Sequence, residues 1–184
     1  EYLKNINGLI TKNFCNDKIN FVENLDSLNF PAWEDFPLEN YWKLGYSHGP
    51  LSEKKYISIL SSRGCPYPCN FCVVPKTNER RWRSRSPKNV VDEMEYYKKK
   101  FDVKEFHFED LNPTVNDKRT RELCELIIQK KINITWKIVA GTKVESIKDE
   151  KTVELLKQSG CNYISISPES GSKELMKEIA KPFN

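Results

Sequence analysis

The sequence contains no apolar run as long as a membrane-spanning helix, and no signal peptide opens it. Hydrophobic residues make up 38% and charged residues 30% of the 184 residues, a balance typical of a soluble globular domain. Without a secretion signal, the six cysteines indicate a reducing, cytoplasmic compartment and not a disulfide framework. Because the first residue is Glu1 and not Met, we expect a fragment or a processed chain.

A fourth cysteine is missing from the most informative stretch, which reads SSRGCPYPCNFC over residues 61–72. Cys65, Cys69 and Cys72 are separated by three and then two residues. A closed zinc site, like an ordinary four-cysteine iron–sulfur site, needs four protein ligands. Three thiolates within eight residues therefore predict a metal site with one open position, where a ligand can react.

Zinc is the alternative to an iron–sulfur cluster at these cysteines, and it needs a fourth ligand from His48, His107 or a distant cysteine. The spacing and the missing fourth cysteine favour iron–sulfur. The three isolated cysteines are interpreted as small buried hydrophobic residues: Cys15, Cys124 and Cys161.

A regular alternation of strands and helices begins near residue 55. Four strand–helix units in succession predict an α/β fold with a parallel sheet, right-handed crossovers and helices outside the sheet. The apolar runs predict strands at 56–60, 103–108, 134–139 and 163–167, and the helical spacing of apolar residues predicts helices at 87–101, 118–131, 150–158 and 172–180.

Residues whose side chains can bind a metal or a ligand follow three of the four predicted strands. The cysteines come after the first strand, Glu109 and Asp110 after the second, and Glu169 after the fourth. Ligands of parallel sheets bind at the carboxyl ends of the strands. We therefore expect these residues to contribute to one shared site.

The net charge is +4, and the clearest basic stretch is 76–88, where four arginines surround Trp82. Basic and aromatic residues together are typical of RNA-binding surfaces. A zinc-stapled nucleic-acid-binding module is thus the alternative function. The favoured interpretation is a loop that pairs with carboxylates or with a bound anionic group, without a nucleic-acid partner. The four arginines are Arg80, Arg81, Arg83 and Arg85.

The cysteine spacing, with a strand before it and Phe71 just before the last cysteine, resembles the signature of the radical S-adenosylmethionine (SAM) superfamily. In that family three cysteines hold a 4Fe–4S cluster, and the fourth iron binds the amino and carboxylate groups of SAM. One electron then cleaves SAM to a 5′-deoxyadenosyl radical. The resemblance implies that Cys65, Cys69 and Cys72 bind the cluster and that Phe71 contacts the cofactor. It also implies an electron donor of the flavodoxin or ferredoxin type.

Two further stretches resemble motifs of this family. Residues 106–113, FHFEDLNP, are similar to the second-strand motif of the subgroup with an N-terminal cobalamin-binding domain. The resemblance implies that Glu109 or Asp110 holds the SAM ammonium group. Residues 165–172, SISPESGS, resemble the fourth-strand motif, in which Glu169 would accept hydrogen bonds from the ribose hydroxyls. This sequence departs from the motif at Pro168, where a glycine is usual.

The resemblance also divides the chain. Residues 1–50 are predicted to be a linker from an upstream cobalamin-binding domain, and residues 51–184 a radical SAM core. That core would be a partial (βα) barrel, truncated after about four of the usual six units. No Asp-x-His-x-x-Gly pattern occurs in the sequence, so any cobalamin would be bound by a domain outside this chain. The predicted reaction is methyl transfer or an oxidative or rearrangement step on an unknown small-molecule, lipid or peptide substrate.

Overall fold

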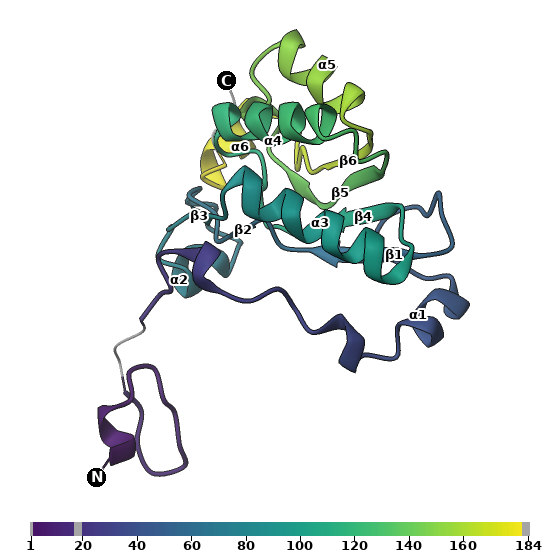
Figure 1. Cartoon of the computed structure of the whole chain (residues 1–184). Helices are drawn as coiled ribbons and strands as arrows, with labels where there is room; N and C mark the ends of the chain where they lie inside the picture. Colours follow the sequence, from purple (N-terminus) through teal and green to yellow (C-terminus); the bar gives the residue numbers. More distant parts are fainter. Residues whose placement is uncertain (1, 17–19, 182–184) are drawn as a thin grey trace.

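The computed structural model of the chain describes residues 2–16 and 20–181. Its centre is a four-stranded parallel sheet in the order β1-β4-β5-β6 (Figure 1). All three neighbouring pairs of strands are parallel, so the predicted α/β class and parallel sheet are confirmed. The strands are β1 (Tyr56–Ile59), β4 (Glu105–Phe108), β5 (Thr135–Thr142) and β6 (Cys161–Ile166).

One helix follows each strand of the sheet, which confirms the four predicted strand–helix units. In each helix, an N-cap side chain accepts a hydrogen bond from a backbone N–H of the first turn. Figure 1 shows α3, α4 and α5 side by side on one face of the sheet. The helices are α3 (Pro87–Phe101), α4 (Asp117–Gln129), α5 (Glu150–Gln158) and α6 (Lys173–Glu178).

Shorter elements surround this frame. An antiparallel pair, β2 (Ser62–Arg63) with β3 (Arg83–Ser84), closes the loop that carries the cysteines, and α2 (Val74–Thr77) lies within that loop. A further helix, α1 (Leu38–Leu44), precedes the sheet. The remaining short turns are 3-10 helices at Tyr2–Asn5, Leu25–Ser27, Trp33–Asp35 and Val144–Ser146.

The two faces of the sheet differ in chemistry, because neighbouring residues of a strand point to opposite sides. On the helix side, Phe106 and Phe108 of β4 pack in the hydrophobic core with residues of α3 and α4. On the opposite side, which we call the inner face, β4 places Glu105 and His107, and both are fully buried. The inner face is therefore covered by other parts of the chain although the major helices lie on the other side.

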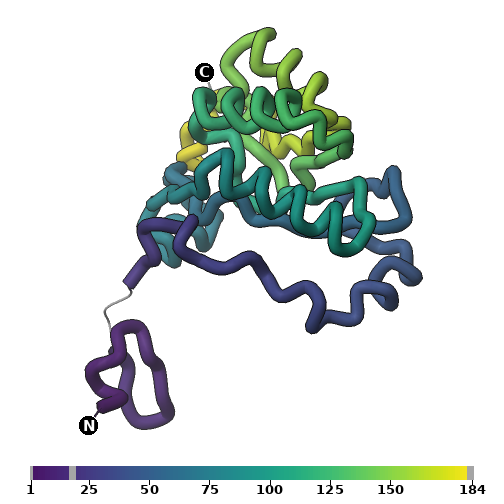
Figure 2. The backbone as a smooth tube through the Cα atoms, in the orientation of Figure 1, coloured from purple at the N-terminus to yellow at the C-terminus, as the bar shows by residue number. Residues whose placement is uncertain are grey.

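The segment before the sheet contributes to the core. Figure 2 shows the chain between residue 20 and α1 running along the side of β1. Phe30, Trp33 and Trp42 pack against the core, and the indole of Trp42 donates a hydrogen bond to the carbonyl oxygen of Tyr56 at 2.8 Å. The sequence predicts a turn and a strand at residues 16–21, but residues 17–19 lie outside the described part of the chain.

The isolated cysteines differ in their surroundings. Cys124 is buried and Cys161 is half-buried, but Cys15 is exposed, so the prediction of a buried residue is wrong there. Cys15 belongs to a short turn in which it pairs with Ile10 through the backbone, and none of residues 2–16 around it is buried. Among the described residues, no helix combines the length and apolar character needed to cross a membrane.

Candidate cofactor site

The three cysteines of the motif lie around one cavity of about 170 Å³, which we call the cysteine cavity. Cys65, Cys69 and Cys72 all have free thiols. The backbone N–H of Cys72 bonds to the carbonyl of Cys69 at 3.2 Å, and its sulfur accepts a hydrogen bond from the N–H of Val74 at 3.4 Å. The loop thus turns the thiols toward a common space.

Gly64 allows this loop to pass close to its neighbour. Its φ of +83° lies in the left-handed region, and a Cβ there would be 1.9 Å from the carbonyl oxygen of Arg81. On the other side of the loop, Nε of Arg80 donates a hydrogen bond to the carbonyl oxygen of Pro66 at 3.2 Å. The backbone therefore holds the first cysteine in place before any ligand binds.

The cavity disfavours free thiolates. Burial raises the pKa of the Cys65 thiol, and the neighbouring cysteines raise it further. Burial also raises the pKa of Cys69, although the ammonium of Lys181 opposes this shift. A metal centre supplies the positive charge that thiolates need, and binding it releases their protons. Three thiols around one cavity are thus a donor set that fits a cluster.

The arrangement does not match a site for a single ion. Among residues 2–16 and 20–181, no three Cys, His, Asp or Glu side chains are grouped closely enough to hold one metal ion. His48 bonds to Glu109 and His107 to Glu105, so neither histidine completes a zinc site with the cysteines. In an iron–sulfur cluster each thiolate binds a different iron, which suits more widely spaced sulfurs.

The rest of the cysteine cavity is lined by residues at the carboxyl ends of the strands. Phe71 lines the cavity from the cysteine loop, and Gly141 and Thr142 line it from the end of β5. Glu169, after β6, lines it as well and forms an ion pair with Lys181 at 2.7 Å. Glu169 has a φ of +63°, an uncommon conformation for a residue with a side chain.

Asp110 is enclosed within the protein and does not line this cavity. Its carboxylate accepts hydrogen bonds from the N–H of Ser61 at 3.0 Å, the hydroxyl of Ser61 at 2.8 Å and the hydroxyl of Ser62 at 2.5 Å. Burial raises the pKa of Asp110, although these hydrogen bonds and the charge of Arg119 oppose the rise. Asp110 therefore joins the end of β4 to the start of the cysteine loop.

Glu109 lies on the inner face and lines a second cavity of about 290 Å³, beside the free edge of β1. The carboxylate oxygen Oε2 of Glu109 is 2.8 Å from Nδ1 of His48. The structure thus separates the two adjacent acids, since Glu109 remains accessible to a ligand and Asp110 does not. The sequence motif alone did not distinguish them.

Comparison with known proteins agrees with this geometry. The family described as the radical SAM superfamily matches residues 59–184. The chain belongs to the radical SAM superfamily. The predicted fold class and family are therefore both confirmed, and the defining cofactors of this family are a 4Fe–4S cluster and SAM.

Relatives within the superfamily differ in reaction. The chain is 32% identical over 162 residues to cytidylyl-2-hydroxyethylphosphonate methyltransferase of Streptomyces wedmorensis, covering 87% of this chain and 30% of that protein. It is 33% identical over 153 residues to anaerobic magnesium-protoporphyrin IX monomethyl ester cyclase of Rubrivivax gelatinosus, covering 83% of this chain and 26% of that protein. The chain thus spans less than a third of each relative.

A solved structure supports the fold of this radical SAM chain. The methyltransferase TsrM from Kitasatospora setae, with cobalamin and a [4Fe-4S] cluster bound, superposes with a TM-score of 0.59 at 24% identity. The match covers 66% of this chain and 22% of TsrM.

The basic stretch of this radical SAM chain is used within the fold. The guanidinium groups of Arg81 and Arg85 pair with Glu23 and Glu93, respectively. Nη1 of Arg83 donates a hydrogen bond to the carbonyl oxygen of Val22 at 2.7 Å. These contacts agree with the favoured interpretation of a loop that pairs with carboxylates, and the zinc-stapled nucleic-acid module gains no support from them.

Proposed function

We propose that this chain is the cofactor-binding part of a radical SAM enzyme, in which Cys65, Cys69 and Cys72 bind a 4Fe–4S cluster. The observation that supports this most is the shared cysteine cavity, which three free thiols line together with Phe71 and Glu169. When bound, the cluster supplies one electron and an open coordination position for the amino and carboxylate groups of SAM. Every other contribution comes from the side chains and backbone around it.

Three features of the cavity suit SAM beside the cluster. Gly141 has a φ of +113° and no side chain, which permits a ligand to approach the end of β5 closely. Phe71 is partly exposed at the cavity, and its ring can shield the adenosine of SAM from water. Glu169 can accept hydrogen bonds from the ribose hydroxyls, and the ion pair with Lys181 orients its carboxylate.

Glu109 is the acid that we propose for the SAM ammonium group. Asp110 is the other acid of the motif, but its carboxylate is buried and already accepts three hydrogen bonds. A desolvated ammonium group needs an accessible anion, and Glu109 offers one on the inner face.

We further propose that the complete enzyme carries out methyl transfer or an oxidative reaction; two of its relatives are named as a methyltransferase and a cyclase. Its electron donor is of the flavodoxin or ferredoxin type, and it acts in a reducing compartment, the cytoplasm. Cobalamin, if used, is bound by a domain outside residues 1–184.

Anaerobic reconstitution with iron and sulfide tests the proposal. We expect about four irons per chain, since the proposed cluster is of the 4Fe–4S type, and a change in its electron paramagnetic resonance (EPR) spectrum when SAM is added. Cys69→Ser removes a thiol of the cavity and should abolish the cluster. Cys124→Ser, a control outside the cavity, should retain it. Stoichiometric zinc without iron, or a full cluster in Cys69→Ser, would contradict the proposal.

A further inference from the structure

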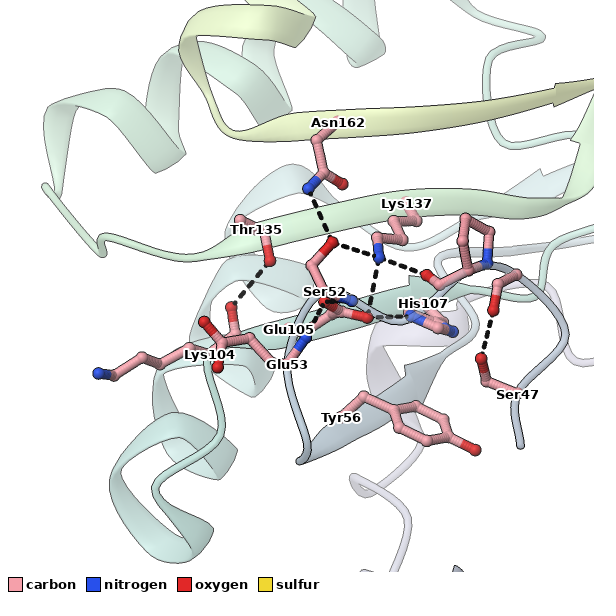
Figure 3. Close-up of polar contacts among 12 residues, drawn as sticks. Ser47, Ser52, Glu53, Tyr56, Lys104, Glu105, His107, Thr135, Lys137 and Asn162 are labelled. Carbon is pink, nitrogen blue, oxygen red and sulfur yellow. Dashed lines mark hydrogen bonds and ion pairs between the residues drawn. The ribbon is translucent and has the colours of Figure 1, made fainter. Parts of the chain in front are cut away.

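A loop at residues 47–53, here called the inner-face loop, is fixed to the inner face of the sheet by two buried charges (Figure 3). The carboxylate of Glu105 accepts hydrogen bonds from the backbone N–H groups of Ser52 at 2.9 Å and Glu53 at 3.0 Å. The ammonium of Lys137 donates to the carbonyl oxygen of Pro50 and, at 2.8 Å, to the hydroxyl of Ser52. Both strands β4 and β5 thus hold the same short loop.

These two charges also pair with each other, which makes the attachment rigid. Nζ of Lys137 is 3.0 Å from Oε1 of Glu105, and their side chains are 1% and 0% exposed. Nε2 of His107 lies 2.7 Å from the same oxygen of Glu105, and the ring of His107 stacks on Tyr56. If the loop moved away, these charges would lose bonding partners inside the protein, which is costly. The loop therefore has one strongly preferred position.

This position brings His48 to Glu109. Next to His48, Gly49 lies so close to β5 that an added Cβ would be 2.6 Å from a methyl carbon of Val139. The imidazole Nδ1 of His48 is 2.8 Å from Oε2 of Glu109. The two side chains are 54% and 28% exposed, so a ligand can reach the pair.

The pair lies close to the cysteine cavity along the same face of the sheet. Glu109 follows β4 in register with Val139, because Phe108 pairs with Ile138 in the preceding position. Gly141, which lines the cysteine cavity, is two residues beyond Val139. At about 3.3 Å per residue, two residues of a strand span about 7 Å, which is within the combined reach of a glutamate side chain and the amino-acid part of SAM.

We infer that His48 is a positioning residue for Glu109. Its Nδ1–H donates to Oε2 and holds the carboxylate, while Oε1 has no hydrogen-bond partner within the described part of the chain. That oxygen is then available to accept a hydrogen bond from the α-amino group of SAM bound at the cysteine cavity. This inference rests on the proposed function, and it gives the inner-face loop a role in cofactor binding.

SAM binding to the reconstituted holoprotein tests the role of His48, with the EPR spectrum of the cluster as the readout. We expect His48→Ala to raise the Kd for SAM about 10-fold, which corresponds to about 1.4 kcal/mol, close to the lower end of what a hydrogen bond to a charged group contributes. His48→Asn retains an N–H donor and should bind SAM within about 3-fold of the wild type. Glu53→Gln, an exposed change on the same loop, is the control. Iron content should stay the same in all three.

An analogue of SAM without the α-amino group makes the test specific. If Glu109 receives the ammonium group, His48→Ala and Glu109→Gln weaken binding of SAM but leave binding of the deamino analogue unchanged. Equal losses for both ligands, equal losses in His48→Ala and His48→Asn, or no loss in His48→Ala would each overturn the inference. If the wild-type holoprotein shows no response to SAM, the proposed function itself fails.

Discussion

Replacement of Lys137 by Met should destabilise the protein by about 3–5 kcal/mol, because it removes one partner of a buried ion pair. Lys137 is 1% exposed and its ammonium contacts three acceptors, the carboxylate of Glu105, the hydroxyl of Ser52 and the carbonyl of Pro50. Met fills a similar volume, so the loss measures the charge and its hydrogen bonds more than the packing. Anaerobic urea denaturation at pH 7.5, followed by circular dichroism, gives the free energy of unfolding.

The pH dependence identifies the cause. Burial alone would raise the pKa of Glu105, but hydrogen bonds from His107, Lys137 and the N–H of Ser52 outweigh it and lower that pKa. A carboxylate with a lowered pKa stabilises the fold above its unfolded pKa of about 4.3, and the stabilisation is lost as the pH falls through the folded value. Without Lys137, the pKa of Glu105 rises because burial is opposed by fewer hydrogen bonds. Glu105 in the variant is then protonated at a higher pH, so the stability that Lys137→Met loses relative to the wild type should shrink as the pH falls toward about 4.3.

Lys118→Met provides a matched control, since Lys118 pairs with Glu122 on the surface at 3.8 Å and is 88% exposed. Its loss should be below about 1 kcal/mol. Combining Lys137→Met with Glu105→Gln should recover part of the loss, because the carboxylate is then no longer buried without its counter-charge. A deficit for Lys137→Met below about 1 kcal/mol at pH 7.5, or one that grows as the pH falls, would refute the role assigned to the pair.

Three further outcomes are expected. Gly64→Ala should lower iron incorporation, because a Cβ there would be 1.9 Å from a backbone oxygen; Gly171→Ala, with nothing within 4 Å of the added atom, should not. Asp110→Asn should lose about 2–3 kcal/mol in thermal or urea unfolding, because a neutral amide removes the charge that strengthens the hydrogen bonds from Ser61 and that faces the buried guanidinium of Arg119. The protein without a bound cluster can be treated with an alkylating reagent at pH 8 and followed by mass spectrometry. Cys15 should be alkylated well before Cys124, because Cys15 is exposed and burial raises the pKa of Cys124 to about 11.

The strands and helices could be predicted because their apolar residues recur with regular spacing, but the end of β5 could not. The predicted strand stopped at Val139, whereas β5 continues through Thr142. Residues 140–142 are Ala, Gly and Thr, which carry little apolar signal. They belong to the strand because Thr142 pairs with Ile166 of β6, and the hydroxyl of Thr142 also bonds to Asn112 at 2.7 Å. A strand end shaped by a binding site lacks the pattern that marks a core.

The alternation of side chains along β4 distinguishes the two adjacent acids. Neighbouring residues in a strand face opposite sides, and the aromatic residues at 106 and 108 mark the helix side. Continuing the alternation places Glu109 on the inner face with Glu105 and His107, and Asp110 on the other side. The serines that receive Asp110, at 61 and 62, lie 49 and 48 residues away, and no local pattern could indicate that contact.

The inner-face loop crosses the predicted boundary between residues 1–50 and 51–184, so the residues of this site lie on both sides of that boundary. One ammonium group, that of Lys137, bonds to Pro50 on one side of the division and to Ser52 on the other. His48, before the division, reaches Glu109 across 61 residues of sequence. The connection from the residues before the inner-face loop to the sheet passes through a loop that buried charges hold against the sheet. Movement of that connection would therefore act on Glu109 directly, since the same seven-residue segment at 47–53 carries both the anchor and the imidazole.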